Sequence, residues 1–337
     1  MHITTTVSTR GRYDTTLPLT LVSIANQVVV PNDLIIFDDN QPPTDLRNNP
    51  LYQYIFSLLS VKGINWSVLF TGGRGQVANH QAALEIAKGD FIHRVDDDEV
   101  LDPACLIYLR QSMMNGVGAV GGLVLDPKNV KELPSFASNR LEDIYTGFNI
   151  QWFKFEGIKD VDHLTSTFLY RKEAASSYCK ELSPIGHREE SIFVFEIKRK
   201  GWKVLVDPRA ITWHLRFPLG GIRNNNQAFW DFDEKIFQQK LKEWGVTPRK
   251  RKLIVLNSGL GDHLIFKQVL PEIKTKYPDL MLAVCYPEVF EDEKNIQLIS
   301  IADAMLLGDI TQYSVYKWCI DHNHKESMIN VYRRMYL

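Results

Sequence analysis

The sequence has little cysteine, no long apolar run and almost no excess of charge. Its four cysteines lie far apart and form no CxxC pair, which argues against a zinc site or a disulfide framework and favours a reducing compartment. No apolar run approaches the roughly 18–20 residues that cross a bilayer, and the first residues do not resemble a signal peptide. The chain has 39 basic and 40 acidic residues, so its net charge is close to zero and no overall positive electrostatic field attracts nucleic acid. We therefore expect a cytoplasmic protein without a transmembrane segment or a nucleic-acid partner, and attachment to the periphery of a membrane stays open.

The N-terminal part reads as an α/β fold. Short apolar runs alternate with helical patterns, which predicts βαβ units and an open, mainly parallel sheet flanked by helices. Strands are expected at Ile3–Ser8, Asp33–Phe37, 68–70, Asp90–Val95 and 119–125, and helices at Leu17–Gln27 and Gln76–Ala87. Acidic clusters follow two of these strands directly, at the edge where open parallel sheets bind ligands.

Three domains are expected along the chain. Residues 1–225 form the first, and its less regular second half has short strands at Ser166–Tyr170 and Lys203–Val206 and a helix at Glu190–Lys200. Residues 226–252 read as a helical linker that ends in a basic run. A new strand and a glycine-rich turn then begin a small Rossmann-like half domain at 253–337, with a further strand expected at Met305–Leu307.

The segment Val95–Glu99 carries three consecutive aspartates at the end of a strand. Like charges so close together need a cation nearby. In an extended chain Asp96 and Asp98 would point to one side and Asp97 to the other. Two convergent carboxylates with open coordination positions suit Mg²⁺ or Mn²⁺ that holds a diphosphate. The alternative is a solvated acidic turn without a ligand.

Several segments of residues 1–215 resemble glycosyltransferase family two. The turn Val7–Arg12 is similar to the family's "PT-x-N-R" turn, and the two segments Leu21–Gln27 and Leu34–Asn40 are similar to its "L-x-S-I-x-x-Q" and "E-I-I-V-V-D-D-G-S" patterns. Ala87–Asp98 is similar to "A-K-G-E-Y-I…L-D-x-D-D". The resemblance implies the GT-A fold and Asp96 and Asp98 as the metal-binding pair. His80 stands where the family often has an arginine.

The resemblance also implies residues that bind the nucleotide. They lie at the end of the first strand and in the loop after it, at the end of the second strand, in the helix expected at 76–87 and in the aspartate triplet. These residues are Ser8, Thr9, Arg12, Asp38, Asp39, His80 and Asp97. A carboxylate there can accept hydrogen bonds from the base or the ribose. An alternative role for Asp38 and Asp39 is to cap a turn.

The second half of the site is expected between residues 160 and 215. The segment Gly186–Glu190 resembles the family's "G-x-E-D" pattern, which implies Glu190, or else Glu189, as the base that deprotonates the acceptor hydroxyl. Two acids in the first turn of a helix also need no catalytic reason, because the helix dipole favours them. The segment Val206–His214 resembles the stretch that returns a histidine to the metal in many GT-A enzymes, which implies His214 as a third metal ligand. His163 and Thr165 lie where the family contacts donor sugar or acceptor.

The C-terminal part resembles the opening of the heptosyltransferase-like GT-B enzymes of family nine. The resemblance rests on the turn Asn257–Asp262 together with Leu270-Pro271 and Lys276–Asp279. At about 85 residues it is roughly half of one such domain, and it is either a truncated second enzyme or a relic used for packing or pairing. We expect it to have no transfer activity of its own.

The expected function is therefore a metal-dependent, inverting transfer of a hexosyl or related sugar in glycan or polysaccharide synthesis. The donor would be a nucleoside-diphosphate sugar of the UDP, GDP or dTDP type, the acceptor a glycan or lipid-linked hydroxyl, and the cofactor Mn²⁺ or Mg²⁺. The alternative is a non-catalytic sugar-nucleotide-binding or scaffold protein with a degenerate site. A nucleotidyltransferase lacks support, because the glycine-arginine-lysine loop expected after the first strand is absent. A homo-oligomer stays open.

Overall fold

The protein is described by a computed structural model over residues 1–128, 140–142, 155–222, 227–247, 252–306 and 314–337. These residues divide into two compact units. The larger unit contains the described residues up to Thr247 apart from Glu142, and the smaller contains the residues from Lys252 onward. The expected domain limits at 225 and 252 stay predictions, because the segments 223–226 and 248–251 lie outside the described residues.

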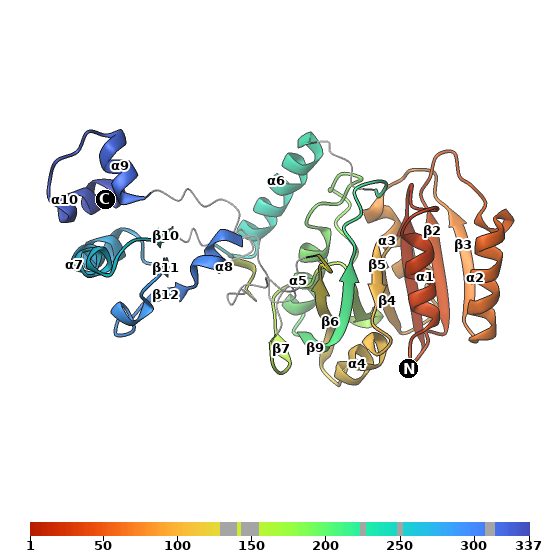
Figure 1. The fold of residues 1–337 in the computed structure, drawn as a ribbon. Helices are drawn as coiled ribbons and strands as arrows, with labels where there is room; N and C mark the ends of the chain where they lie inside the picture. The colour runs from red at the N-terminus through yellow and green to blue at the C-terminus, as the bar shows by residue number, and fades with distance from the viewer. Residues whose placement is uncertain (129–139, 143–154, 223–226, 248–251, 307–313) are drawn as a thin grey trace. The chain divides into compact units, whose positions relative to one another are not determined.

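The first half of the large sheet is parallel. Its strands lie in the order β3-β2-β1-β4 (Figure 1) and comprise β1 (Ile3–Thr9), β2 (Asp33–Asp38), β3 (Asn65–Phe70) and β4 (Phe91–Asp96). Ser8 is the register partner of Asp96 across β1 and β4. The carboxyl ends of these strands therefore meet at one edge, where the loops diverge.

The second half of the sheet is mixed. Beyond β4 the order continues β8-β6-β9-β5, with β7 paired to β9. The bounds are β5 (Glu99–Leu101), β6 (Val117–Leu125), β7 (Lys159–Asp160), β8 (Phe168–Arg171) and β9 (Lys203–His214). Strand β8 is antiparallel to both neighbours, whereas β6 and β9 run parallel. The expected open α/β sheet flanked by helices is confirmed, and its parallel part is the half built from β1 to β4.

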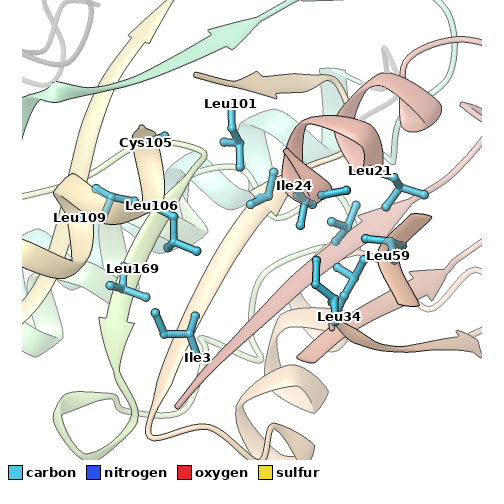
Figure 2. Packing of buried hydrophobic residues seen from close by; sticks show 14 of the residues in the cluster. Ile3, Leu21, Ile24, Leu34, Leu59, Leu101, Cys105, Leu106, Leu109 and Leu169 are labelled. Atoms are coloured by element: carbon cyan, nitrogen blue, oxygen red, sulfur yellow. The ribbon is translucent and has the colours of Figure 1, made fainter. Parts of the chain in front are cut away.

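Helices cover both faces of the parallel half. Strand residues alternate between faces, so Leu34 and Ile36 pack in the main core while Ile35 and Phe37 pack against Ala83 on the opposite side. The main core gathers side chains from α1 (Leu17–Ala25), α2 (Pro50–Val61) and α4 (Cys105–Ser112), several of which are shown in Figure 2. The other helical segments of this unit are η1 (Leu46–Asn48), α3 (Gln76–Ile86), η5 (Lys172–Ala174), α5 (Glu189–Arg199) and α6 (Gln227–Glu243).

Two elements of this unit are not among those expected from the sequence. Helix α2 begins at Pro50, whose missing N–H suits a first helical position. The side chain of Asn49 caps it by accepting a hydrogen bond from the Leu51 N–H at 2.9 Å. Strand β5 is only three residues long and is antiparallel to the end of β9. Both elements lie in segments where no strand or helix was expected.

The smaller unit has its own three-stranded parallel sheet in the order β10-β11-β12. Its elements are β10 (Lys252–Leu256), α7 (Leu260–Lys276), β11 (Leu280–Val284), η6 (Pro287–Val289), β12 (Ile296–Ile299), α8 (Ile301–Leu306), α9 (Val315–Asp321) and α10 (Met328–Tyr336). The strand expected at Met305–Leu307 is wrong for Met305 and Leu306, which end a helix; Leu307 lies outside the described residues. The third strand is β12 instead, and Leu298 packs against the unit's core. Among the described helices, none combines the length and apolarity that a bilayer crossing requires.

Core packing in the larger unit can be tested at Leu106 of α4. This side chain is 0% exposed, so Leu106→Ala leaves a cavity and should lower the free energy of unfolding by about 2–5 kcal/mol. Leu51→Ala, at a position that is 53% exposed, is the matched control and should change it little. Urea unfolding of the full chain measures both, and equal losses would contradict this account of the core.

Candidate functional site

A cavity of about 280 Å³ opens at the carboxyl ends of β1 and β4. Its walls come from the first loop, from α3, from the acidic turn after β4 and from the segment after β9. The lining residues are Ser8, Arg12, Gln76, His80, Asp96, Asp97, Asp98, His214, Arg216, Phe217, Gly221 and Ile222. Seven residues that the sequence predicted for nucleotide or metal binding thus line one cavity: Ser8, Arg12, His80, Asp96, Asp97, Asp98 and His214.

The aspartate triplet forms a turn and does not continue the strand. Strand β4 ends at Asp96, and β5 begins at Glu99. The expected alternation, with Asp97 pointing away from its neighbours, is therefore wrong. Asp97 and Asp98 share one partner, since the Arg12 guanidinium lies 3.3 Å from Asp97 Oδ1 and 3.1 Å from Asp98 Oδ2. Asp96 Oδ1 instead lies 3.6 Å from Arg94 Nη2.

Burial and neighbouring charges set different protonation equilibria for the three acids after Asp96. Burial raises the pKa of Asp97 to about 7 even though Arg12 opposes the rise. Burial also acts on Asp98, but the hydrogen bond from His214 and the charges of His214 and Arg12 outweigh it and lower the pKa of Asp98 below its ordinary value. Glu99 is fully buried, so its pKa is raised well above the usual range, and it accepts a hydrogen bond from Thr167.

Strand pairing brings His214 to the acidic turn. His214 is the last residue of β9 and the register partner of Glu99 in β5. Its Nε2 lies 3.3 Å from Asp98 Oδ2. Asp96 and His214 keep part of their side chains exposed, at 23% and 26%.

Carboxylate oxygens and an imidazole nitrogen are suitable ligands for Mn²⁺, so the chemistry of this donor set fits a divalent ion. Over the described residues, no three acidic, histidine or cysteine side chains are gathered into a ready metal cluster.

Asp38 and Asp39 do not line the cavity. Both are 0% exposed and have protein partners. Asp38 accepts hydrogen bonds from the Tyr13 hydroxyl at 2.5 Å and from Asn40 Nδ2 at 2.6 Å. Asp39 forms an ion pair with Arg10 and accepts a hydrogen bond from the Thr71 hydroxyl. The two carboxylates hold the first loop in place, and their direct contact with a nucleotide stays a prediction.

Thr9 is also fully buried. Its hydroxyl lies beside Asp97 and counteracts the rise in the pKa of that carboxyl. Thr9 does not line the cavity, so its expected contact with a nucleotide stays a prediction as well.

The two glutamates at the start of α5 have different surroundings. The turn before them places Gly186 and Arg188 at positive φ, and the helix begins at Glu189. Glu189 is 1% exposed, and its Oε1 lies 2.5 Å from Arg94 Nη1. Glu190 is half-buried. Glu189 is therefore part of a buried ion pair, and Glu190 is the more accessible of the two acids.

Arg94 is a residue of this site that the sequence analysis missed. It is 1% exposed and lies in the middle of β4, two residues before Asp96. Its partner Glu189 has two further polar neighbours. Gln76 Nε2 lies 3.2 Å and His80 Nε2 lies 3.8 Å from Glu189 Oε1. An arginine in an otherwise buried strand was the available signal, because such a charge needs a partner.

His163 and Thr165 precede β8 and do not line the cavity. His163 is buried, and burial together with the charge of Arg188 lowers the pKa of its imidazole to about 4. It is therefore neutral at neutral pH. Its Nδ1 has no hydrogen-bond partner among the described protein atoms. Thr165 is half-buried. Their contact with donor sugar or acceptor stays a prediction.

Comparison with known proteins gives a family. The family model described as "Glycosyl transferase family 2" matches residues 7–179, which is 173 of the 337 residues. The matched range contains the end of β1, α3, the acidic turn and β8. No curated protein matches the sequence. The family nine resemblance of the C-terminal part is not among these findings.

Several solved structures are similar over part of the chain. A structure of GalNAc-T7 with UDP, GalNAc and Mn²⁺ has 13% identity and a TM-score of 0.49, over 64% of this chain and 44% of that one. The mannosyltransferase PcManGT of Pyrobaculum calidifontis, with GDP-Man and Mn²⁺, has 14% identity and a TM-score of 0.46, over 72% and 64%. S. aureus TarS 1–349 with UDP-GlcNAc has 16% identity and a TM-score of 0.47, over 72% and 67%. The chain thus spans less than two thirds of the first two, and none of these values transfers a substrate to it.

The buried pair of Arg94 and Glu189 should behave as one unit. Arg94→Met alone leaves the Glu189 carboxylate buried without its cation, so it should cost about 3–5 kcal/mol of unfolding free energy. The double variant Arg94→Met/Glu189→Leu removes both charges and should cost less than the sum of the two single changes. Urea unfolding of the wild type, Arg94→Met, Glu189→Leu and the double variant gives the four unfolding free energies of this double-mutant cycle.

An exposed pair provides the control for this cycle. Arg47→Met breaks the contact of Arg47 with Asp45 at the surface and should leave the unfolding midpoint nearly unchanged. Additive single effects at Arg94 and Glu189 would show that the two side chains do not stabilise each other.

Proposed function

Because the chain belongs to glycosyl transferase family 2, we propose that it moves a hexosyl or related sugar from a nucleoside-diphosphate sugar to an acceptor hydroxyl of a glycan or lipid-linked molecule. The observation that carries the proposal is the meeting of Arg12, the aspartate turn and His214 around one cavity at the carboxyl ends of parallel strands. Cationic and acidic groups together suit a diphosphate and its counter-ion.

The donor would lie in this cavity. Ser8, Arg12, His80 and Asp97 line it and would contact the nucleotide part. The buried residues Thr9, Asp38 and Asp39 would contribute to the same nucleotide pocket, and the two aspartates also hold the loop that carries Arg12. A guanidinium is well suited to phosphate oxygens, because its planar donors can bind two of them at once.

Asp96, Asp98 and His214 are the residues that would hold Mn²⁺ or Mg²⁺. Such an ion would act as a Lewis acid and stabilise negative charge on the departing diphosphate. The hydrogen bond from His214 and the charges of His214 and Arg12 lower the pKa of Asp98, so its carboxylate is ionised at neutral pH.

Glu190 is the proposed base. Its carboxylate would take the proton of the acceptor hydroxyl while that oxygen forms a bond to the anomeric carbon and the bond to the nucleoside diphosphate breaks. Attack from the face opposite the leaving group would invert the anomeric centre. Glu189 would keep its ion pair with Arg94 and fix the first turn of α5, and His163 and Thr165 would lie on the sugar or acceptor side.

The wider setting follows from the same proposal. The activity would serve glycan or polysaccharide synthesis in the cytoplasm. The smaller unit would be a family nine-like half domain without transfer activity of its own, used for packing or for pairing of two copies. Residues 253–337 expressed alone should therefore turn over no sugar nucleotide, and any turnover by that piece would refute this assignment.

One observation favours a second candidate function, a sugar-nucleotide-binding protein without catalysis. The carboxylates of Asp97 and Asp98 are already paired with Arg12, and Glu189 with Arg94. Turnover measurements separate this candidate from the enzyme.

Two carboxylate variants test catalysis. Asp98→Ala should lower the Mn²⁺-dependent hydrolysis of a panel of UDP-, GDP- and dTDP-sugars by at least about 100-fold, because it removes a ligand of the ion. Glu190→Gln should lower transfer to an acceptor by about 100-fold or more, because the amide cannot accept the proton. Glu173→Gln, an exposed glutamate paired with Arg171, is the control and should keep full turnover. Turnover by Asp98→Ala at the wild-type rate would exclude the metal assignment.

Ligand-dependent stability tests binding apart from catalysis. UDP, GDP or dTDP together with Mn²⁺ should raise the melting temperature of the wild-type chain, because a ligand that binds only the folded state stabilises it. At a concentration 100 times its Kd the matching nucleotide should add about 2.7 kcal/mol. A melting temperature that none of the three nucleotides changes, with or without metal, would refute both the enzyme and the binding protein.

A further inference from the structure

The Arg12 guanidinium contacts the carboxylates of Asp97 and Asp98 in the acidic turn and supplies the positive charge beside them. Its Nε lies 3.3 Å from Asp97 Oδ1, its Nη1 lies 3.1 Å from Asp98 Oδ2, and its Nη2 donates to the Phe217 carbonyl oxygen at 3.4 Å. Only 8% of the side chain is exposed. Arg12 therefore neutralises two carboxylates whose mutual repulsion would otherwise be strong in a site with little water.

Arg12 also contacts an atom that the proposed function assigns to the divalent ion. Asp98 Oδ2 lies 3.1 Å from Arg12 and 3.3 Å from His214 Nε2, so both neighbours address the same carboxylate oxygen. That oxygen has two lone pairs. A ligating imidazole must direct the lone pair of its nitrogen at the ion and then cannot donate to Asp98. The ion and Arg12 would then be two cations at one carboxylate oxygen, and their mutual repulsion at this short distance makes each weaken the binding of the other.

The segment after β9 covers Arg12 closely. Gly220 and Gly221 have φ of 78° and 91°. A Cβ on Gly220 would lie 2.2 Å from the Gly11 carbonyl oxygen, and one on Gly221 would lie 2.9 Å from Arg12 Nη2. The Gly221 N–H donates to the Arg10 carbonyl oxygen at 2.6 Å. Only residues without side chains allow this approach, and the result is a guanidinium enclosed on one side and facing the cavity on the other.

We propose that Arg12 is the resident counter-cation of Asp97 and Asp98, and that a bound diphosphate takes over its guanidinium and thereby frees Asp98 for the divalent ion. This role rests on the proposed function and adds to it a coupling between nucleotide binding and ion binding. Phosphate oxygens are strong acceptors for a guanidinium, and an anionic diphosphate can accommodate Arg12 and the ion together. Nucleotide and ion therefore bind cooperatively, and each strengthens the other by the same factor.

The test is Mn²⁺ binding, followed through the electron paramagnetic resonance signal of the free ion, with and without UDP or GDP. In the wild-type chain the matching nucleotide should tighten Mn²⁺ binding by about 10-fold or more. Arg12→Gln should bind Mn²⁺ about 10-fold more tightly than wild type when no nucleotide is present, because Asp98 has lost its competing cation. The same variant should bind the nucleotide more weakly and show little coupling. Mn²⁺ affinity of Arg12→Gln equal to or below that of wild type would overturn the proposal.

Two further variants separate this role from general effects of charge and folding. Arg216→Gln removes another positive charge that lines the cavity but is paired with Asp126 and is 55% exposed, so it should change Mn²⁺ affinity much less. Arg12→Lys keeps the charge but cannot bridge two carboxylates with one planar group, so its Mn²⁺ affinity should lie between those of wild type and Arg12→Gln. An equal gain in Arg216→Gln and Arg12→Gln would reduce the effect to through-space charge and overturn the proposal.

Failure of the coupling is distinguishable from failure of the proposed function. Wild-type chain that binds Mn²⁺ and nucleotide independently overturns the role of Arg12 and leaves the transferase intact. Wild-type chain that binds neither UDP nor GDP in the presence of Mn²⁺ overturns the assigned donor site. In that case the Arg12→Gln comparison without nucleotide still decides whether Arg12 shields Asp98.

Discussion

Carboxylates buried around the end of β4 need cations within reach, and two arginines meet this requirement. Arg94 pairs with Glu189 inside the protein, and Arg12 pairs with Asp97 and Asp98 at the wall of the cavity. Burying a lone charge costs several kcal/mol, so each pair fixes the elements that carry its members. Strand β4, the first turn of α5, the loop after β1 and the acidic turn are joined in this way. The site is held together by opposite charges at short range.

The parallel half of the sheet determines where these charges meet. Register places Ser8 beside Asp96, and both strands end at the same edge. The mixed half adds His214 through the pairing of β9 with β5. The family match covers the first of these contributions and ends at residue 179, before the second. The roles proposed for His214, Glu189 and Glu190 therefore rest on the geometry of the site and on the sequence resemblance of the segments that carry them.

Much of the fold could be predicted from the sequence, because alternation and helical spacing are local signals. The strands at β1, β2 and β4 and the helices α1, α3 and α5 were expected within one or two residues of their bounds. Short β5 was not expected, because three residues carry no periodicity. Most of the acidic, basic and histidine residues that line the cavity could also be predicted, because they lie in segments that resemble the sequence patterns of the family. The partners of Asp97, Asp98 and Glu189 were not, because contacts between distant residues such as Arg12 and Asp98 depend on how the loops fold.

Strand β9 carries a histidine whose position depends on correct pairing over twelve residues. Two register irregularities already interrupt its ladder with β6, near Gly121 and between Val117 and Ala119. A slip of one residue against β5 would set Trp213 opposite Glu99 and turn His214 to the other face of the sheet. The same slip would turn the buried residues of β9 away from the core. Burial of these residues therefore fixes the register that places the imidazole beside the acidic turn.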